Sequence, residues 1–403
     1  MKIVHLISGS ITSGASRGAI NLHNNLLKEK ISSTILTDDK SVNSKIISTN
    51  INIIKIILKK ILILLDKSLK LFYYKRKKTS FSPSIFGENL SKIEIIKNAD
   101  IIHLHWVNNS FLKISEFIKL KDKKIVWTLR DMWSFTGGCH YSLGCNKYKT
   151  ECGLCPQLGS NSLYDLSTLI FRKKKKAFAN CKNLYFVANS KWLEQKARAS
   201  KLINNKNLFQ INNLIDKDNF FYESKKINKK IIITFGCQYV EARYKGFDYF
   251  LDSLKYLDKT KFKIYIFGKL WNFDKLNQLN FDYKYLGYIN NKTKLRKIYS
   301  ETDIFISSST EDAFPKTFAE AMLCRSAVIC FEKTSVSKLI NHKKNGYIAK
   351  FKSGRDIANG IKWLTKTNLK MKKIQVNAEK YSNTFFDPVK LTNEYIKFYK
   401  LIK

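Results

Sequence analysis

The stretch Ser308–Met322, SSTEDAFPKTFAEAM, directly follows the apolar run Asp303–Ser307, which is typical of a short buried strand. Residues 313–317 then lead into a predicted helix that carries Phe318 and Glu320. The amides at the start of this helix, with Lys316 beside them, suit a diphosphate group. Glu320, about one turn further on, is placed to accept hydrogen bonds from ribose hydroxyls. The alternative is an ordinary capped helix with acidic residues near its start.

The same alternation of short apolar strand and amphipathic helix extends in both directions from this stretch. Strands are predicted at 2–8, 34–37, 100–104, 124–129 and 184–188, and again at 230–236, 263–267, 284–286, 303–307 and 327–331. Strands that alternate with helices indicate parallel α/β layers, and 403 residues exceed one ordinary core. We therefore expect two Rossmann-like domains, 1–215 and 216–380. A terminal helix within 381–403, with Leu391, Tyr395 and Tyr399 on one face, should pack back on the first domain.

The net charge is +41, from 73 basic and 32 acidic residues. Lysine predominates over arginine and is spread along the chain with many isoleucines and asparagines. This pattern indicates either the codon usage of an AT-rich genome or an acidic membrane partner. A nucleic-acid partner is disfavoured, because arginine is scarce and lysines cluster with aromatic residues only at 67–78.

Segment 51–78 joins a densely apolar run to a lysine-rich extension that contains Phe72, Tyr73 and Tyr74. In a helix, three lysines would share one face opposite four apolar residues. These are Lys55, Lys59 and Lys60 against Ile53, Ile57, Ile61 and Leu64. Basic amphipathic helices of this type lie in membrane interfaces, so we expect the segment to bind an anionic membrane surface. The alternative is a core-packed helix with lysine on its outer face.

The chain shows no secretory leader, because the apolar residues after Met1 and Lys2 are too few for one. It also contains no uncharged apolar run of about 18 residues or more, so no spanning helix is expected. We therefore expect a cytoplasmic protein that is peripheral on the inner face of the cell membrane.

Four of the eight cysteines lie close together within a predicted loop, 139–155. They are Cys139, Cys145, Cys152 and Cys155. In a reducing cytoplasm, grouped thiols indicate a structural zinc ion more readily than disulfides. Such an ion would brace the long loop, and His140 is a spare candidate ligand.

A glycine-bearing loop, Gly9 to Gly18, lies between the first predicted strand and helix. Backbone amides there could approach a phosphate at the helix start. A plain tight turn explains this loop about as well, since it lacks the dinucleotide-binding spacing of glycines.

Residues 312–322, DAFPKTFAEAM, resemble the E-x7-E signature of the retaining family 4 glycosyltransferases, in the variant with aspartate as the first acid. Further matches follow the family order along nearly the whole chain. They are Leu104–Trp106, Thr128–Tyr141, Ala188–Leu193, Asn213–Asp216, Lys245–Phe247 and Asn345–Tyr347. The subgroup that the chain resembles builds bacterial surface polysaccharides such as colanic acid, capsule and O-antigen.

The resemblance implies a GT-B fold, in which two Rossmann-like domains face each other across a cleft. It also implies transfer of a hexose from a UDP- or GDP-sugar to a lipid-linked saccharide, with retention of configuration. Neither a protein nucleophile nor a catalytic metal is expected. The alternatives are a non-hydrolysing sugar-nucleotide epimerase on the related scaffold and a basic nucleic-acid-binding protein.

The resemblance also assigns site residues. Lys245 and Arg243 would neutralise the donor diphosphate, Asp312 would hold the transferred sugar and Glu320 the ribose. The full donor-side set is Arg243, Lys245, Asp312, Phe314, Pro315, Lys316, Thr317 and Glu320. The acceptor-side set is Gly14, His105, Trp106, Arg130 and Asp131.

Three positions depart from the family pattern. Arg130 replaces a usual histidine, Arg325 stands where the family has glycine, and Lys333–Thr334 replace a common glycine pair. Bulk at these positions is expected to narrow the donor pocket, change the donor or weaken catalysis.

Overall fold

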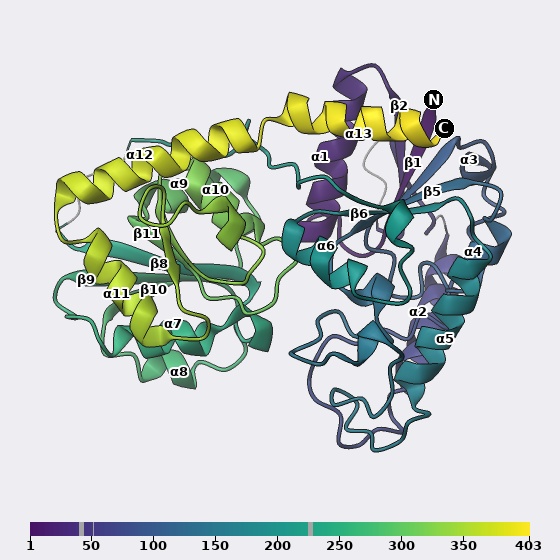
Figure 1. Ribbon diagram of the computed structural model, residues 1–403, viewed down its shortest axis with the longest axis horizontal. Coiled ribbons are helices and arrows are strands. Elements are labelled where there is room, and N and C mark those ends of the chain that lie inside the picture. The colour runs from purple at the N-terminus through teal and green to yellow at the C-terminus, as the bar shows by residue number, and fades with distance from the viewer. Residues whose placement is uncertain (40–43, 51, 225–228) are drawn as a thin grey trace. The chain divides into compact units, whose positions relative to one another are not determined.

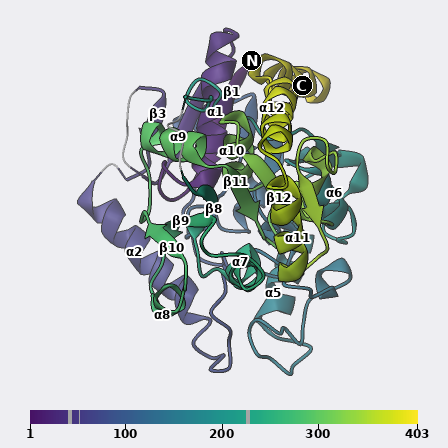
Figure 2. The same ribbon diagram turned by 90° about the vertical axis from the view of Figure 1, so that its left-hand side faces the viewer.

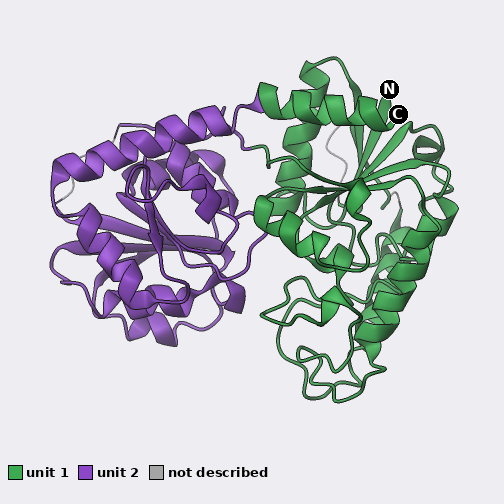
Figure 3. Cartoon of the chain, in the orientation of Figure 1, with its two compact units in different colours: residues 1–214, 389–403 green, residues 215–388 purple. Residues whose placement is uncertain are grey.

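In the computed structural model the chain forms two compact units, residues 1–214 with 389–403, and residues 215–388 (Figure 1, Figure 3). The structure describes residues 1–39, 44–50, 52–224 and 229–403. Ile51, the first residue of the expected membrane segment, lies outside the described residues. Each unit is built on its own parallel β-sheet.

The sheet of unit 1 has the strand order β3-β2-β1-β4-β5-β6-β7, and every pair is parallel. Its strands are β1 (Lys2–Ile7), β2 (Ser32–Thr37), β3 (Ile46–Ser48), β4 (Ile101–Leu104), β5 (Lys124–Leu129), β6 (Leu184–Ala188) and β7 (Leu208–Gln210). The central strands are almost entirely apolar because helices and loops cover both faces of the sheet.

The helices of unit 1 include one from the far end of the chain. They are α1 (Gly14–Lys28), α2 (Ile53–Ser68), α3 (Glu94–Lys97), α4 (Glu116–Lys119), α5 (Leu166–Ala179), α6 (Lys191–Arg198) and α13 (Pro388–Ile402). In α13, Leu391, Tyr395 and Tyr399 are buried in one core cluster with Ile101 and Val126 of the sheet. The C-terminal helix is therefore part of the hydrophobic core of unit 1.

The sheet of unit 2 has the order β10-β9-β8-β11-β12-β13, again all parallel. Its strands are β8 (Ile231–Tyr239), β9 (Phe262–Lys269), β10 (Asp282–Tyr285), β11 (Ile304–Ser307), β12 (Ala327–Phe331) and β13 (Tyr347–Ala349). Its helices are α7 (Phe247–Leu254), α8 (Asp274–Asn277), α9 (Lys292–Glu301), α10 (Lys316–Leu323), α11 (Gly354–Leu364) and α12 (Asn368–Phe385). Two core clusters form, one beneath α7 and α11 and the other beneath α9 and α10.

The expected fold class, two parallel-sheet α/β domains, is confirmed. The structure moves the second boundary, because unit 2 continues to Pro388 and not to 380. Helix α12 ends at Phe385 and a separate helix begins at Pro388. Proline cannot donate a backbone hydrogen bond and disfavours helical geometry in the residue before it, so one continuous helix is interrupted here. Proline fits well at the first position of the new helix.

The expected face pattern of the segment 51–78 requires a correction. Lys59, placed with Lys55 and Lys60 on an outer basic face, is buried in α2. The apolar residues opposite it are exposed, so the helix is not core-packed with lysine outside. None of the helices formed by the described residues has the length and apolar character needed to cross a membrane.

Candidate functional site

In both sheets, successive strands are added first on one side of the first strand and then on its other side. In unit 2, β9 and β10 lie on one side of β8, and β11 to β13 lie on the other. In unit 1 the corresponding point lies between β1 and β4. Ligands of open parallel sheets bind beyond the carboxyl ends of the strands at such points. The loops that follow β8 and β11, and those that follow β1 and β4, are therefore the candidate sites of the two units.

In unit 2 the turn after β8 is fastened to the loop after β11. Gly246 has φ +70°, and a Cβ atom there would collide with the carbonyl oxygen of Ser308. The Ser308 hydroxyl donates to the carbonyl of Gly246 at 2.8 Å, and the Thr310 amide donates to the carbonyl of Tyr244 at 2.8 Å. Only glycine combines this backbone conformation with so close an approach. The turn Arg243–Lys245 is consequently held against residues 308–312.

This arrangement brings Lys245 and Asp312 into an ion pair. Burial lowers the pKa of Lys245, but the adjacent Asp312 carboxylate outweighs that effect and raises the pKa above its ordinary value. The ammonium therefore stays charged at any physiological pH. The second Asp312 oxygen accepts from the amide of Phe314 at 3.1 Å, so the carboxylate also shapes the loop before α10. Arg243, at the other end of the same turn, is exposed.

Helix α10 begins at Lys316, and no side chain caps its first amides. Pro315 precedes it and Thr317 follows, so the backbone amide donors of this first turn lie at the carboxyl end of the sheet. Such donors, with the helix dipole behind them, favour an anion. One turn further on, Glu320 is buried, and its Oε2 accepts a hydrogen bond of 3.0 Å from the Tyr299 hydroxyl on α9. Tyr299 thus fixes the orientation of the Glu320 carboxylate.

The predicted donor-side residues all lie in the two loops that follow the neighbouring strands β8 and β11, or in the first turns of α10. Of these, Lys245 and Asp312 contact each other directly. Sequence reasoning did not identify Tyr299 or the Ser308 contact with Gly246. A buried tyrosine on a neighbouring helix carries no local sequence signal, so Tyr299 could not have been found from the motif alone.

In unit 1, Trp106 and Asp131 follow β4 and β5. The Asp131 carboxylate accepts from the Trp106 indole at 3.2 Å and lies 2.6 Å from Nδ1 of His140. His140 in turn lies 2.9 Å from the Ser82 hydroxyl through its Nε2. His140, considered as a spare metal ligand, is therefore a partner of Asp131. Gly14 is the first residue of α1, where the Ser13 hydroxyl accepts from the Ser16 amide.

Arg130 is held by two partners of unit 1. It donates to Oδ1 of Asn213 at 2.8 Å and to Nδ1 of His105 at 3.0 Å. Gly18 of α1 lies so close that a Cβ atom there would be 2.6 Å from Nη1 of Arg130. Glycine at position 18 therefore makes room for the guanidinium, which replaces the histidine usual in similar proteins.

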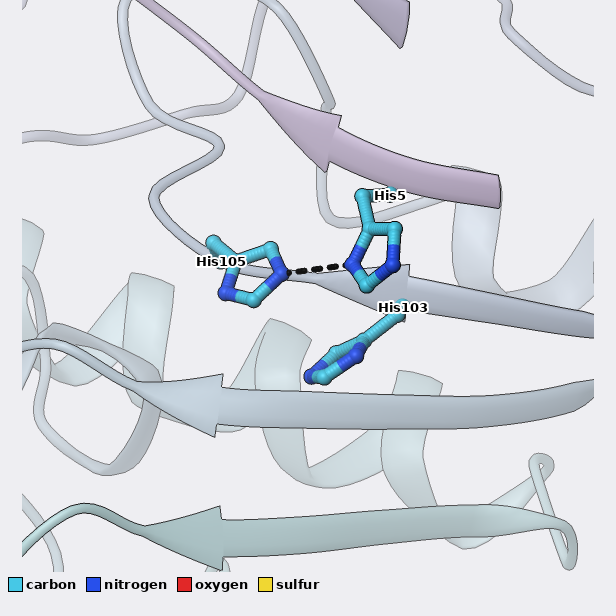
Figure 4. A group of neighbouring side chains, drawn as sticks. All are labelled: His5, His103 and His105. Carbon is cyan, nitrogen blue, oxygen red and sulfur yellow. Dashed lines mark hydrogen bonds between the residues drawn. The ribbon is translucent and has the colours of Figure 1, made fainter. Parts of the chain in front are cut away.

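Three buried histidines, His5, His103 and His105, lie together (Figure 4), and His105 contacts Arg130. Nε2 of His105 lies 3.0 Å from Nδ1 of His5. Because a guanidinium only donates, Nδ1 of His105 accepts the hydrogen bond from Arg130. Nε2 of His105 therefore carries the hydrogen and donates a hydrogen bond to Nδ1 of His5. Burial lowers the pKa values of His5 and His103 well below the ordinary value, so both rings are neutral.

The ring nitrogens of these histidines lie within 4.8 Å of one another, close enough for a metal ion. The hydrogen bonds argue against one. His103 lies 2.6 Å from the Tyr399 hydroxyl and 2.7 Å from the Thr128 hydroxyl, through its two nitrogens. His105 uses its two nitrogens on Arg130 and His5. Within this cluster His105 orients Arg130, and the His103 ring packs against the rings of His5 and His105.

The four loop cysteines, Cys139, Cys145, Cys152 and Cys155, line one pocket beneath Phe81 and Tyr148. Burial raises the pKa of Cys152 to about 12 and also raises the pKa of Cys139. Among the described residues, the thiols do not form a trio within 4.8 Å of one another, as the histidines do. The loop brings the four thiols to one place without closing a tetrahedron.

Two of the residues that depart from the family pattern share an unusual backbone conformation. Arg325 and Lys333 both have φ +62°, a conformation that favours glycine. Arg325 donates from Nε to Glu379 of α12 at 2.6 Å, and its guanidinium lies 4.1 Å from the centre of the Tyr222 ring. Lys333 is exposed. These positions therefore retain the glycine-type backbone, and the Arg325 side chain packs against α12 and Tyr222.

The chain was compared with known proteins. The family of glycosyl transferases group 1 matches residues 216–381. A candidate colanic acid biosynthesis glycosyl transferase of Escherichia coli is 36% identical over 69 residues, which are 16% of this chain and 17% of the relative. The N,N'-diacetylbacillosaminyl-diphospho-undecaprenol alpha-1,3-N-acetylgalactosaminyltransferase of Campylobacter jejuni is 26% identical over 223 residues, 55% of this chain and 57% of that protein. These alignments thus span less than two thirds of either relative.

The crystal structure of HepE from Anabaena in complex with UDP-glucose has a TM-score of 0.65 at 14% identity and covers 99% of both chains. The two parallel-sheet α/β domains have the GT-B fold of this structure. Residues 216–381, which match the glycosyl transferases group 1 family, coincide with nearly all of unit 2.

Proposed function

We propose that this protein is a retaining glycosyltransferase. It transfers a hexose from a UDP- or GDP-sugar to a lipid-linked saccharide in the biosynthesis of a bacterial surface polysaccharide. The observation that carries the proposal is the arrangement in unit 2 of the Lys245–Asp312 pair, the first turn of α10 and the buried Glu320. These groups supply a fixed positive charge, amide donors and a carboxylate at the end of one sheet.

Each group has a chemical role in this proposal. The α10 amides and Lys245 bind the diphosphate, and Lys245 stabilises the charge that develops as the nucleoside diphosphate leaves. Glu320, oriented by Tyr299, accepts from the ribose hydroxyls. Asp312 contacts the transferred sugar while it holds Lys245 in place. No protein nucleophile is assigned, and no metal ion takes part in the transfer.

The donor and acceptor classes are supported by the similar proteins. HepE binds UDP-glucose, and the Campylobacter relative is named for a diphospho-undecaprenol acceptor. In this chain we assign the acceptor side to the loops of unit 1 after β1, β4 and β5, with Gly14, Trp106 and Asp131. Because such an acceptor is anchored in a bilayer, the enzyme is proposed to work as a peripheral protein on the cytoplasmic membrane face.

The function is tested with the purified full-length protein, a panel of UDP-, GDP- and dTDP-sugars and a membrane extract as acceptor. A transferase releases nucleoside diphosphate from one donor, only when the acceptor is present. Conversion of the sugar nucleotide without acceptor would identify an epimerase instead. Tight, salt-sensitive binding of polynucleotides without affinity for any sugar nucleotide would identify a nucleic-acid-binding protein.

We also propose that Cys139, Cys145, Cys152 and Cys155 hold a structural zinc ion. Four thiolates on one pocket match the ligand set of a closed zinc site. Binding would draw the sulfurs into a tetrahedron at about 2.3 Å from the ion. The ion would stabilise the loop and take no part in the transfer.

A further inference from the structure

Helix α2 is oriented in the reverse of the usual way for a surface helix. Its buried residues are Lys59 and Asp66, whereas most of its isoleucines and leucines are exposed. Residues seven apart lie on the same side of a helix, so Lys59 and Asp66 define its inward face. The polar face of α2 therefore contacts unit 1, and its apolar face contacts solvent. Figure 2 shows the ribbon of this helix.

The inward face is attached by specific polar contacts. Lys59 lies 3.1 Å from Asp38 and 2.8 Å from Glu88, and its ammonium lies 5.1 Å from the centre of the Phe111 ring. One turn from the end of the helix, the Asp66 carboxylate accepts three backbone amides of residues 84–86, at 2.8 to 3.2 Å. These contacts hold α2 in place without using its apolar side chains.

The outward face is continuous and strongly apolar. Its side chains are 44% to 72% exposed, and they are Ile53, Ile54, Ile57, Leu58, Ile61, Leu64 and Leu65. A row of this length on a soluble monomer marks an interaction surface. The helix has no apolar partner on this side within the part of the chain that the structure describes.

The apolar surface continues beyond the end of α2. Leu71, Phe72 and Tyr74 are 70%, 84% and 86% exposed. The Tyr73 hydroxyl accepts from the amide of Leu166, and an open pocket of about 440 Å³ lies between these two segments. On the far side of the pocket, Tyr164 is also exposed. Aromatic residues at the end of an apolar helix are typical of the boundary between lipid tails and headgroups.

The charges around this apolar surface indicate which kind of partner binds it. Lys60 and Lys67 flank the apolar face and are exposed, and four consecutive basic residues, 75–78, follow the aromatic residues. An anionic bilayer satisfies both features, because its headgroups attract the lysines and its acyl region accepts the isoleucines and leucines. A second copy of the chain is disfavoured, since it would bring the same basic border against itself in a protein of net charge +41.

We infer that the apolar face of α2, Ile53 to Leu65, with Leu71, Phe72 and Tyr74, inserts into the interface of an anionic lipid bilayer. The helix lies in the membrane plane, while Lys59 and Asp66 keep it attached to unit 1. Docking requires no unfolding of α2, because the apolar side chains already face outward. That the protein needs to bind a membrane rests on the proposed function, whereas the assignment of the docking surface rests on the geometry of α2.

The docking surface is linked to the acceptor side of unit 1 through one carboxylate. Asp38, the partner of Lys59, also accepts from the Ser8 hydroxyl at 2.8 Å and from the Gly9 amide at 2.6 Å. Ser8 and Gly9 form the start of the loop after β1, which we assigned to the acceptor. The loop to which we assign the acceptor is therefore connected to α2 through Asp38.

The test uses full-length protein and sedimentation with vesicles of phosphatidylcholine containing a third phosphatidylglycerol, beside vesicles of phosphatidylcholine alone. We expect Ile57→Ser, Ile61→Ser and Leu64→Ser together to weaken binding to the anionic vesicles at least tenfold. Lys60→Gln with Lys67→Gln should weaken binding to anionic vesicles and remove its salt dependence. Leu369→Ser, at a leucine of unit 2 that is 79% exposed, is the control and should bind like the parent.

Unchanged vesicle binding by the triple serine variant would overturn the inference. So would a dimer of the parent in ultracentrifugation without lipid that the triple variant loses, because the face would then join two copies. Turnover with a water-soluble acceptor should remain at the parent level in the triple variant. If the parent transfers no sugar from any donor, the proposed function fails, and the vesicle result still decides the docking surface.

Discussion

At the residue scale, Glu320 offers the sharpest test of the donor site. Its carboxylate is buried and oriented by the Tyr299 hydroxyl at 3.0 Å. Glu320→Ala removes charge-assisted hydrogen bonds worth roughly 1.5–3 kcal/mol, so the affinity for the nucleoside diphosphate should fall about ten- to a hundredfold in calorimetry. Glu320→Gln should be milder, because the amide keeps one acceptor. Tyr299→Phe leaves the carboxylate in place and should also have a smaller effect. Parent-like nucleotide binding by a folded Glu320→Ala protein would refute the donor-site assignment.

Lys245 should respond differently from Glu320. Its ammonium is paired with Asp312, and in our proposal it stabilises charge that grows as the nucleoside diphosphate departs. Lys245→Ala should therefore lower kcat by a larger factor than it lowers the affinity for the nucleoside diphosphate. The two effects are separated by measuring turnover on the acceptor beside calorimetry. Equal losses in both quantities would show that Lys245 contributes only ground-state binding.

Lys333, in the loop after β12, allows a test of backbone strain. Its φ of +62° costs a residue with a side chain about 1–2 kcal/mol relative to glycine, and its side chain is exposed. Lys333→Gly should therefore be more stable than Lys333→Ala, by about 1 kcal/mol in urea unfolding. At Lys362, which is exposed within α11, the glycine variant should instead be less stable than the alanine variant, because glycine is unfavourable in a helix. The same order at both positions would mean that residue 333 is unstrained.

At the scale of an element, the loop 139–155 is the clearest case of a segment that needs a stabilising group. It contains a single short 3-10 turn, Lys147–Lys149, and its four cysteines line one pocket. Purified protein should contain about one equivalent of zinc by elemental analysis, and a chelator should lower the melting temperature. Cys152→Ser should lose the metal, whereas Cys181→Ser, outside the group, should retain it. Metal-free protein of full stability would exclude the zinc site.

Helix α2 shows what an amphipathic pattern leaves undecided. The spacing of Lys55, Lys59 and Lys60 against Ile57 and Ile61 predicts one basic and one apolar face, but of the three lysines only Lys59 is buried. It does not say which face contacts the protein, because that depends on partners distant in sequence. Asp38 and Glu88 lie about 20 to 30 residues from Lys59, and they draw it inward. A periodicity that usually buries its apolar side here exposes it.

At the scale of the whole molecule, the buried histidines of unit 1 make stability depend on pH. Burial and nearby cations lower the pKa of His23 to about 4, and they lower those of His5 and His103 well below 6.5. In the folded protein these rings thus stay neutral at a pH at which the same histidines of the unfolded chain take up protons. Stability is therefore retained above about pH 6.5 and lost as the pH falls below it. Three such groups lower the free energy of unfolding by up to about 4 kcal/mol for each unit by which the pH falls.

Urea unfolding at pH 7.5 and pH 5.5 measures this loss. Tryptophan fluorescence reports mainly on unit 1, since four of the six tryptophans lie in it. We expect a clearly lower unfolding midpoint at pH 5.5. His23→Gln, which keeps a partner for the Ser33 hydroxyl, should reduce the difference. An unfolding midpoint that is independent of pH would show that these rings accept protons in the folded protein.

The sequence by itself determined the α/β class and the division near residue 215, and it predicted a donor side made of two segments. These follow from local patterns, because apolar runs, helix starts and glycine turns are set by neighbours in the chain. Only the tertiary structure decided that Tyr299 orients Glu320, that Arg130 rests on a chain of buried histidines, and that Lys59 turns inward. Each of these contacts joins residues far apart in sequence or on different elements. Their energies come from burial and charge in the folded state, so no local pattern encodes them.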